Sequence, residues 1–147
     1  MTGQAVTRPI TRQAGCVAIG GKGILIEGAP GTGKSSLALA LIDRGAQFIA
    51  DDGVLLDAAN GGVIARPHPR TRSLIEVRNL GLLTIPCGES ARIALVITLD
   101  PLAPRYPNHG ESLTFASVAL PHVRIWPQEQ PPAIKAELAL RHFGLQF

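Results

Sequence analysis

Eight consecutive residues, GAPGTGKS (28–35), carry the clearest chemical pattern in the chain. They fit the P-loop pattern G-x-x-x-x-G-K-[ST] at every fixed position. In such a loop, glycines let backbone N–H groups approach phosphate oxygens, the lysine reaches the β- and γ-phosphates, and the hydroxyl ligates Mg²⁺. The residues expected to contact the nucleotide are Gly28, Ala29, Pro30, Gly31, Thr32, Gly33, Lys34, Ser35 and Ser36. The pattern predicts a protein that binds a nucleoside triphosphate.

Two adjacent aspartates, Asp51 and Asp52, follow the apolar run QFIA sixteen residues after Ser35. Two carboxylates this close are tolerated when a cation or a proton lies between them. Beside a P-loop, one could hold the metal and the other could accept a proton from an attacking hydroxyl. A plainer interpretation is that one of them caps a turn before Gly53. Asp100, at the end of ARIALVITLD, is a second candidate for the metal, and the sequence leaves open whether Asp52 or Asp100 binds it.

The segments around these residues predict the elements that position them. Residues 16–19 and 23–27 are β-rich and are joined by a Gly-Gly turn, so they predict a hairpin that leads into the P-loop. An Ala/Leu-rich helix should begin at Ser35 and Ser36 and end at Gly45. The run AQFIA (46–50) then predicts the strand that carries the aspartates.

The remaining elements are mostly strands. The expected strands are 54–58, 73–85 with a break at 79–81, 91–100 and 117–126, and a last helix is expected near 132–143. The sequence therefore predicts one mixed α/β domain over residues 1–147, strand-rich with few helices. This order argues against a regular βαβ repeat.

Composition narrows the classes of partner. The net charge is only +3, and the chain has one Trp and one Tyr for base stacking, so we expect no nucleic acid partner. No apolar run approaches the ~20 residues that span a bilayer, and the first residues lack a signal-peptide core, which predicts a cytoplasmic protein without a membrane partner. The four histidines lack metal-ligand spacing. The basic run RPHPRTR (66–72) is either a solvated loop or a contact for an acidic patch on a protein substrate.

Three segments in order, GILIEGAPGTGKSSLALALIDRG, FIADD and LIEVRNLGLL, resemble the catalytic domain of the bacterial HPr kinase/phosphorylase family. The resemblance extends from about residue 10 to the C-terminus. It implies a core like that of phosphoenolpyruvate carboxykinase, and a kinase that uses ATP and Mg²⁺ to phosphorylate a serine of the phosphocarrier HPr. It also implies a reverse phosphorylase reaction that releases pyrophosphate, and a homo-oligomer whose size the sequence leaves open.

The resemblance also implies roles for individual residues. Asp51 would be the base that takes the serine proton, with Lys34 on the phosphates. Asp52 and Ser35 would lie on the metal side. Glu76 and Arg78 fall on the family's charged signature pair near the metal and phosphates. Without the resemblance, a surface salt bridge between Glu76 and Arg78 is the simpler interpretation of that pair.

The chain departs from the family pattern at four points. Asn79 replaces a signature glycine, and Asn best substitutes for Gly where φ is positive. Gln13 stands where the family usually has a histidine, and Gln130 lies where a loop arginine is expected, so the phosphorylase reaction is left open. The family's separate N-terminal domain is expected to be absent. Two other functions remain in competition, namely a small-molecule P-loop kinase and a non-catalytic nucleotide-binding sensor.

Overall fold

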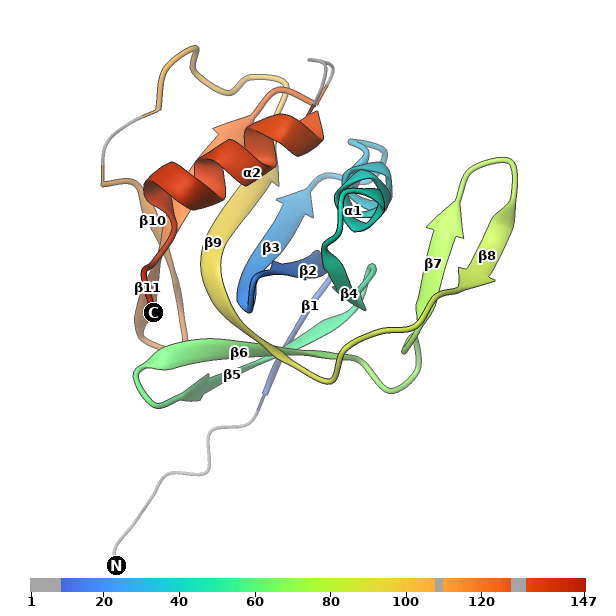
Figure 1. The fold of residues 1–147 in the computed structure, drawn as a ribbon. Coiled ribbons are helices and arrows are strands. Elements are labelled where there is room, and N and C mark those ends of the chain that lie inside the picture. The colour runs from blue at the N-terminus through green and yellow to red at the C-terminus, as the bar shows by residue number, and fades with distance from the viewer. Residues whose placement is uncertain (1–8, 108–109, 128–131) are drawn as a thin grey trace, which may run out of the picture.

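One mixed sheet of nine strands forms the centre of the molecule, as Figure 1 shows for the computed structural model, which describes residues 9–107, 110–127 and 132–147. The strand order is β1-β5-β6-β9-β3-β2-β4, with β11 beside β9 and β10 beside β11. The strands of this sheet are β1 (Ile10–Arg12), β2 (Gly15–Ile19), β3 (Lys22–Gly28), β4 (Gln47–Ala50), β5 (Val54–Ala59), β6 (Gly62–Pro67), β9 (Ala91–Leu99), β10 (Ser112–Phe115) and β11 (Val118–Ile125).

Three neighbouring strands, β3, β9 and β11, run parallel and form the centre of the sheet. The middle strand is β9, in which residues 93–97 are all buried. A continuous apolar run is what a parallel strand covered on both faces requires. The parallel register pairs Gly28 with Leu99, so the start of the P-loop lies beside the end of β9.

Two helices cover one face of this sheet (Figure 1), namely α1 (Lys34–Asp43) and α2 (Pro132–Phe143). Leu37 and Leu41 of α1 pack with Leu140 of α2 and with Ile26 and Ile97 of the sheet. A second apolar cluster fills the other face, where the strongly curved sheet brings β5 and β6 against β2, β3 and β9. The sheet is thus covered on both sides, which fixes the strand ends that carry the polar residues.

A two-stranded hairpin stands apart from the main sheet (Figure 1). It consists of β7 (Leu74–Val77) and β8 (Gly81–Thr84), paired antiparallel. The sequence predicted one interrupted strand here, and the break is a turn that reverses the chain. Asn79 has φ 74°, as predicted for a residue replacing glycine, and Gly81 has φ 95°. Leu80 and Leu82 are 68% and 65% exposed near this turn.

The other predicted elements agree closely with the structure. The last helix has the predicted bounds, and α1 begins one residue earlier than predicted and ends just before Gly45, whose φ is 108°. The strands β1, β6 and β10 were missed. β1 and β10 have only three or four residues, which carry too little periodicity to be recognised, and β6 includes Arg66 and Pro67 of the run 66–72, which was expected to be a loop. In the described part of the chain, neither helix has the length and apolar character needed to span a bilayer.

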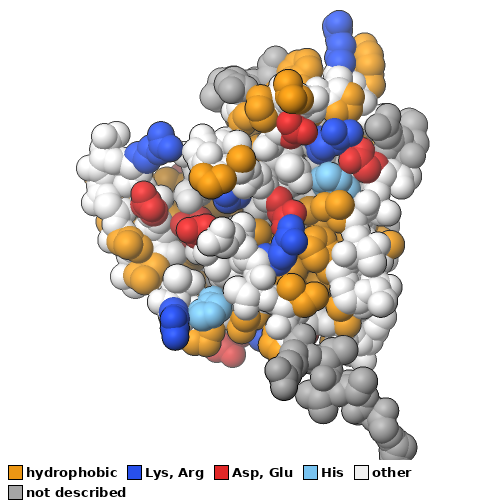
Figure 2. Space-filling model, turned by 180° about the vertical axis from the view of Figure 1, so that it is seen from behind, with side chains coloured by type: hydrophobic (Ala, Val, Ile, Leu, Met, Phe, Trp, Pro, Cys, Tyr) orange, Lys and Arg blue, Asp and Glu red, His pale blue; other side chains and the backbone are white. Residues whose placement is uncertain are grey.

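The face turned away in Figure 1 is shown in Figure 2. Acidic and basic side chains are interspersed on this face, with hydrophobic side chains between them. Neither sign of charge dominates this face as a whole. Where one loop has an excess of basic or acidic side chains, that excess is confined to the loop.

Candidate active site

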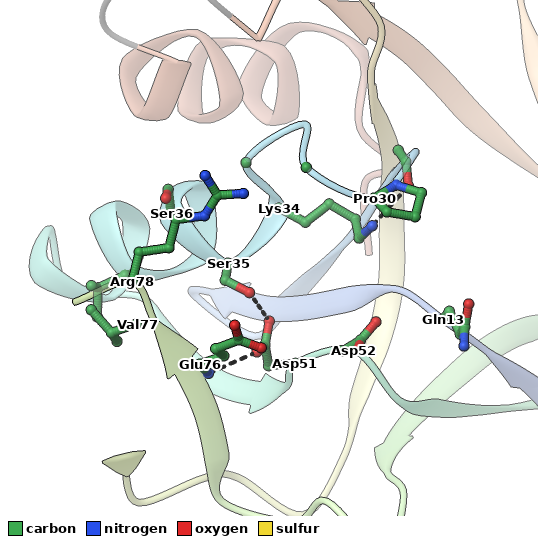
Figure 3. A pocket seen from close by; sticks show the side chains of 14 residues that line it. Gln13, Pro30, Lys34, Ser35, Ser36, Asp51, Asp52, Glu76, Val77 and Arg78 are labelled. Atoms are coloured by element: carbon green, nitrogen blue, oxygen red, sulfur yellow. Dashed lines mark hydrogen bonds between the residues drawn. The ribbon is translucent and has the colours of Figure 1, made fainter. Parts of the chain in front are cut away.

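A pocket of about 420 Å³ brings together the P-loop, the two aspartates and the start of the β7–β8 hairpin (Figure 3). Residues from all three segments line it, although up to 50 residues separate them along the chain. The parts of the pattern that the sequence predicted therefore converge on one cavity.

The P-loop is shaped by its glycines. A Cβ on Gly28 would lie 2.5 Å from Thr32 Oγ1 and 3.1 Å from the Leu99 carbonyl oxygen, so only glycine fits there. Gly31 (φ 83°) and Gly33 (φ 98°) have left-handed backbones, which turn successive N–H groups toward one concavity.

Helix α1 begins immediately after this loop, and no side chain caps its N-terminus. Its first N–H groups and the positive end of the helix dipole are thus available to an anion. Lys34 Nζ donates a hydrogen bond to the Gly28 carbonyl oxygen at 2.8 Å, which holds the ammonium over the loop. The loop presents the backbone donors and the cation that a triphosphate needs.

Asp51 is the buried member of the aspartate pair. It is 5% exposed, and its carboxylate accepts hydrogen bonds from Ser35 Oγ at 2.7 Å and from the Glu76 backbone N–H at 3.2 Å. Burial raises the pKa of Asp51 above its ordinary value; these two hydrogen bonds oppose the shift, and the charges of Asp52 and Glu76 add to it. The contacts of Asp51 reach across the fold, which differs from the local turn-capping role considered for it.

Asp52 and Glu76 complete the acidic lining of the pocket. Asp52 is exposed and has φ 54°, an unusual backbone for a residue other than glycine. Glu76 is also exposed and comes from β7. Among the described residues, neither carboxylate forms an ion pair with a basic side chain. Three carboxylates thus line one cavity in which Lys34 and Arg78 are the basic side chains.

Arg78 lies just beyond the end of β7, in the turn of the hairpin. It lines the pocket, and Figure 3 shows its side chain extending toward Ser36 while Glu76 lies near Asp51. The described residues include no ion pair between Arg78 and Glu76, so the structure does not support the simple surface salt bridge. The two side chains face different parts of the same cavity.

Gln13 also lines the pocket, and in Figure 3 it lies beyond Asp52 as seen from Asp51. Gln130, predicted to replace a loop arginine, lies outside the described residues, as does His109.

Asp100, the other metal candidate, does not line this pocket. Its Oδ1 accepts a hydrogen bond from the Leu102 N–H at 2.8 Å, and its Oδ2 lies 3.8 Å from Arg124 Nη1. The carboxylate therefore stabilises a turn and already has a cationic partner. Of the two candidates, Asp52 is the one that the fold leaves facing the phosphate loop.

The donor set of the pocket fits a magnesium ion bound with a nucleotide. Ser35 donates its proton to Asp51, which leaves the hydroxyl lone pairs available to a cation. No group of three or more His, Cys, Asp or Glu side chains in the described part of the chain is arranged to bind a metal alone. Mg²⁺ is usually held by one or two protein oxygens together with phosphate oxygens and water. The pocket offers such protein oxygens on Ser35, Asp52 and Glu76, next to the P-loop.

A second polar cluster lies next to the P-loop strand and was missed by sequence reasoning. His122 Nε2 lies 2.7 Å from Thr98 Oγ1, and Nδ1 of the same ring lies 3.0 Å from Glu111 Oε1. Arg124 Nε approaches that carboxylate oxygen at 3.1 Å. Neither His122 Nδ1 nor Arg124 Nε has a hydrogen-bond partner within the described residues, whereas Arg124 Nη2 donates a hydrogen bond to Glu111 Oε2 at 3.5 Å. The available signal was the i, i+2 spacing of His122 and Arg124, which places both on one strand face.

Comparison with known proteins shows the family of this chain. The family model for the HPr serine kinase C-terminal domain matches residues 4–120. This chain belongs to that family. The HPr kinase/phosphorylase of Streptococcus equi subsp. zooepidemicus is 32% identical over 118 residues, covering 71% of this chain and 38% of that protein. The HPr kinase/phosphorylase of Mycoplasma mycoides is 43% identical over 65 residues, covering 44% of this chain and 21% of that protein.

This member of the HPr serine kinase family thus spans about two fifths of the length of the streptococcal relative. A solved structure, the Hpr(Ser) kinase/phosphatase from Coxiella burnetii, superimposes with a TM-score of 0.78 over 90% of this chain and 94% of that one, at 24% sequence identity. The predicted strand-rich α/β fold, with few helices and a P-loop, is confirmed.

Proposed function

We propose that this protein is an ATP- and Mg²⁺-dependent protein serine kinase whose substrate is an HPr phosphocarrier. The single observation that carries the proposal is the convergence of the P-loop, the aspartate pair and Glu76 with Arg78 on one pocket. A P-loop alone would support nucleotide binding only. A buried carboxylate beside the P-loop serine adds a group that can take a proton from a substrate hydroxyl.

The positions of these residues around the pocket support a role for each of them. Residues 28–36 hold the phosphates, with Lys34 on the β- and γ-phosphates and Arg78 reaching the transferred group from the hairpin. Ser35, Asp52 and Glu76 would hold Mg²⁺ or its waters. The ion would neutralise charge on the phosphate oxygens during transfer.

Asp51 is the proposed base. Its raised pKa, caused mainly by burial, makes it a better proton acceptor than an exposed aspartate. The serine oxygen would form its bond to the γ-phosphorus while the bond to the ADP oxygen breaks, and the serine proton would pass to the Asp51 carboxylate. In the reverse phosphorylase reaction, which remains part of the proposal, the same group would return the proton.

The test is the mass of an HPr protein after incubation with this protein, ATP and Mg²⁺. We expect a gain of one phosphate, and a loss of about 10²–10⁴-fold in rate for Asp51→Asn, which is the usual contribution of a general base. Asp52→Asn should instead weaken the dependence on Mg²⁺. If Asp51→Asn keeps the wild-type rate while Asp52→Asn loses the pH dependence of kcat, the two roles are exchanged.

The same experiment separates the competing functions. ATP-dependent phosphorylation of a metabolite, with none of HPr, would support a small-molecule kinase. Tight ATP binding without any phosphorylated product would support a nucleotide sensor. Adding inorganic phosphate to phosphorylated HPr tests the reverse reaction, which would release pyrophosphate.

A further inference from the structure

A short basic loop joins the main sheet to the hairpin. It consists of residues 68–73, between β6 and β7, and is called the basic loop below. Arg70 and Arg72 are exposed. Arg72 Nη2 lies 3.4 Å from Glu89 Oε1, but the Glu89 side chain is 90% exposed, so water screens this pair strongly. In the described part of the chain, Arg70 forms no ion pair. Two guanidinium groups are therefore available to an external partner.

The loop is held in one conformation by its own backbone. Thr71 N–H donates to the His68 carbonyl at 3.0 Å, and Leu74 N–H donates to the Thr71 carbonyl at 3.1 Å. The Arg70 N–H donates to His68 Nδ1 at 3.1 Å. These turns present the arginine side chains from a backbone that is already ordered, which lowers the entropy cost of binding.

The basic loop lies against the residue that follows the aspartate pair. His68 N–H donates to the Gly53 carbonyl at 3.3 Å, and a Cβ on Gly53 would meet Thr71 Oγ1 at 2.9 Å. At its other end the loop runs into β7, which carries Glu76 into the pocket. The loop is thus fixed between two segments that line the candidate active site.

The charges around the pocket indicate which kind of protein surface would bind next to it. The carboxylates of Asp51, Asp52 and Glu76 line the inside of the pocket, where the metal and the phosphates are proposed to bind. The basic loop that is bonded to Gly53 carries Arg70 and Arg72, whose side chains are exposed and do not line the pocket. A folded protein that delivers a serine into the pocket must cover the surface next to it, and acidic side chains would complement these arginines there. The net charge of +3 makes a second copy of this chain a poorer match.

We propose that the basic loop docks an acidic face of the folded protein whose serine is phosphorylated. The inference rests on the proposed kinase function and adds to it the charge of the partner and the residues that recognise it. The loop acts in binding and takes no part in phosphoryl transfer. Its arginines raise the rate of association and lower the KM for the protein substrate.

The test compares two doubly substituted variants with the same change in net charge. Arg70→Glu with Arg72→Glu reverses the loop. Arg105→Glu with Arg141→Glu is the matched control, because both residues are exposed and neither lines the pocket. Binding of an HPr protein is measured by titration calorimetry, and the KM and kcat for HPr and for a short serine peptide are measured at several salt concentrations.

The loop variant should bind HPr about tenfold more weakly at low salt, with kcat unchanged and peptide phosphorylation unaffected, as expected for exposed charges that steer association. The difference from wild type should shrink as salt rises, because exposed charges are screened. Equal losses in both variants, or no loss in either, would overturn the proposal. So would a phosphorylation rate for HPr that does not depend on salt.

The binding titration keeps this inference separate from the kinase proposal. If the wild-type protein binds HPr through the basic loop but never phosphorylates it, the docking surface stands and the kinase function fails. If it phosphorylates HPr with full efficiency after the loop is reversed, the kinase function stands and the docking surface fails.

Discussion

Two polar clusters lie on either side of the strand that leads into the P-loop, and they differ in how their charges are balanced. In the pocket, Asp51, Asp52 and Glu76 have no ion pair with a basic side chain among the described residues, and the pKa of Asp51 is raised. In the other cluster, Glu111 and Asp100 both lie against Arg124. Carboxylates with a built-in cation stabilise the fold, whereas carboxylates without one favour an external cation.

This difference also bears on the two metal candidates that the sequence left open, and it favours the proposed role of Asp52. A P-loop protein commonly places its metal-side carboxylate at the end of a neighbouring apolar strand, and Asp100 fits that description. Its contacts with the Leu102 N–H and Arg124 give it a structural role. The pocket carboxylates, which form no ion pair with a basic side chain within the described residues, are therefore the ones proposed to hold a magnesium ion.

The largest expected effect is a stabilisation of the fold that depends on the metal. Saturating ATP with Mg²⁺, at about 100 times its dissociation constant, should stabilise the wild-type protein by about 2.7 kcal/mol. For a chain of this size the midpoint of thermal unfolding should rise by roughly 5–10 °C. Asp52→Asn should lose the part of this rise that depends on Mg²⁺, and Asp100→Asn should keep it, as read by scanning calorimetry with EDTA as the control. The reverse pattern would place the metal at Asp100.

A smaller effect is expected from the second polar cluster, in which Glu111 and Asp100 lie against Arg124. Glu111→Gln removes the carboxylate that faces Arg124 and His122, which leaves Arg124 with Asp100 at 3.8 Å. The free energy of unfolding should fall by about 1–2 kcal/mol, because a partly buried cation loses its nearest counter-charge. Urea unfolding measures the loss. A matched Glu76→Gln substitution should cost less stability, since Glu76 is exposed; a larger loss there would contradict the contrast between the clusters.

The smallest effect is a pH dependence of stability carried by Asp51. The pKa of its carboxyl is raised in the folded chain, so its contribution to stability is fully present below about 3.8, the unfolded value, and is lost as pH rises through the folded pKa. The Asp51→Asn variant has no carboxyl group at this position, so its stability does not fall in this way as pH rises. In EDTA and without nucleotide, the variant should gain stability relative to wild type as pH rises from about 4 to 7. A relative stability that stays flat over this range would show that Asp51 titrates as an exposed aspartate.

The sequence alone was sufficient for the features that local chemistry controls. The P-loop could be predicted because close approach to phosphate requires glycines at fixed spacing. The structure adds a second reason for Gly28, where a Cβ would meet Thr32 and Leu99. The positive φ of Asn79 could be predicted because few residues replace glycine in that conformation. The long apolar strand β9 and helix α2 were also clear, because each repeats its pattern over many residues.

Only the tertiary structure distinguished residues of the same type. Asp51 and Asp52 are identical neighbours in the sequence, yet one is buried against Ser35 and the other is exposed, because the chain turns sharply between β4 and β5. Asp100 is matched with Arg124 through strand pairing between β9 and β11, which no local pattern encodes. The placement of the basic loop against Gly53 depends likewise on contacts distant in sequence. Residue types determined which chemistry was available, and long-range packing decided which of the pocket carboxylates form no ion pair with the basic side chains that the structure describes.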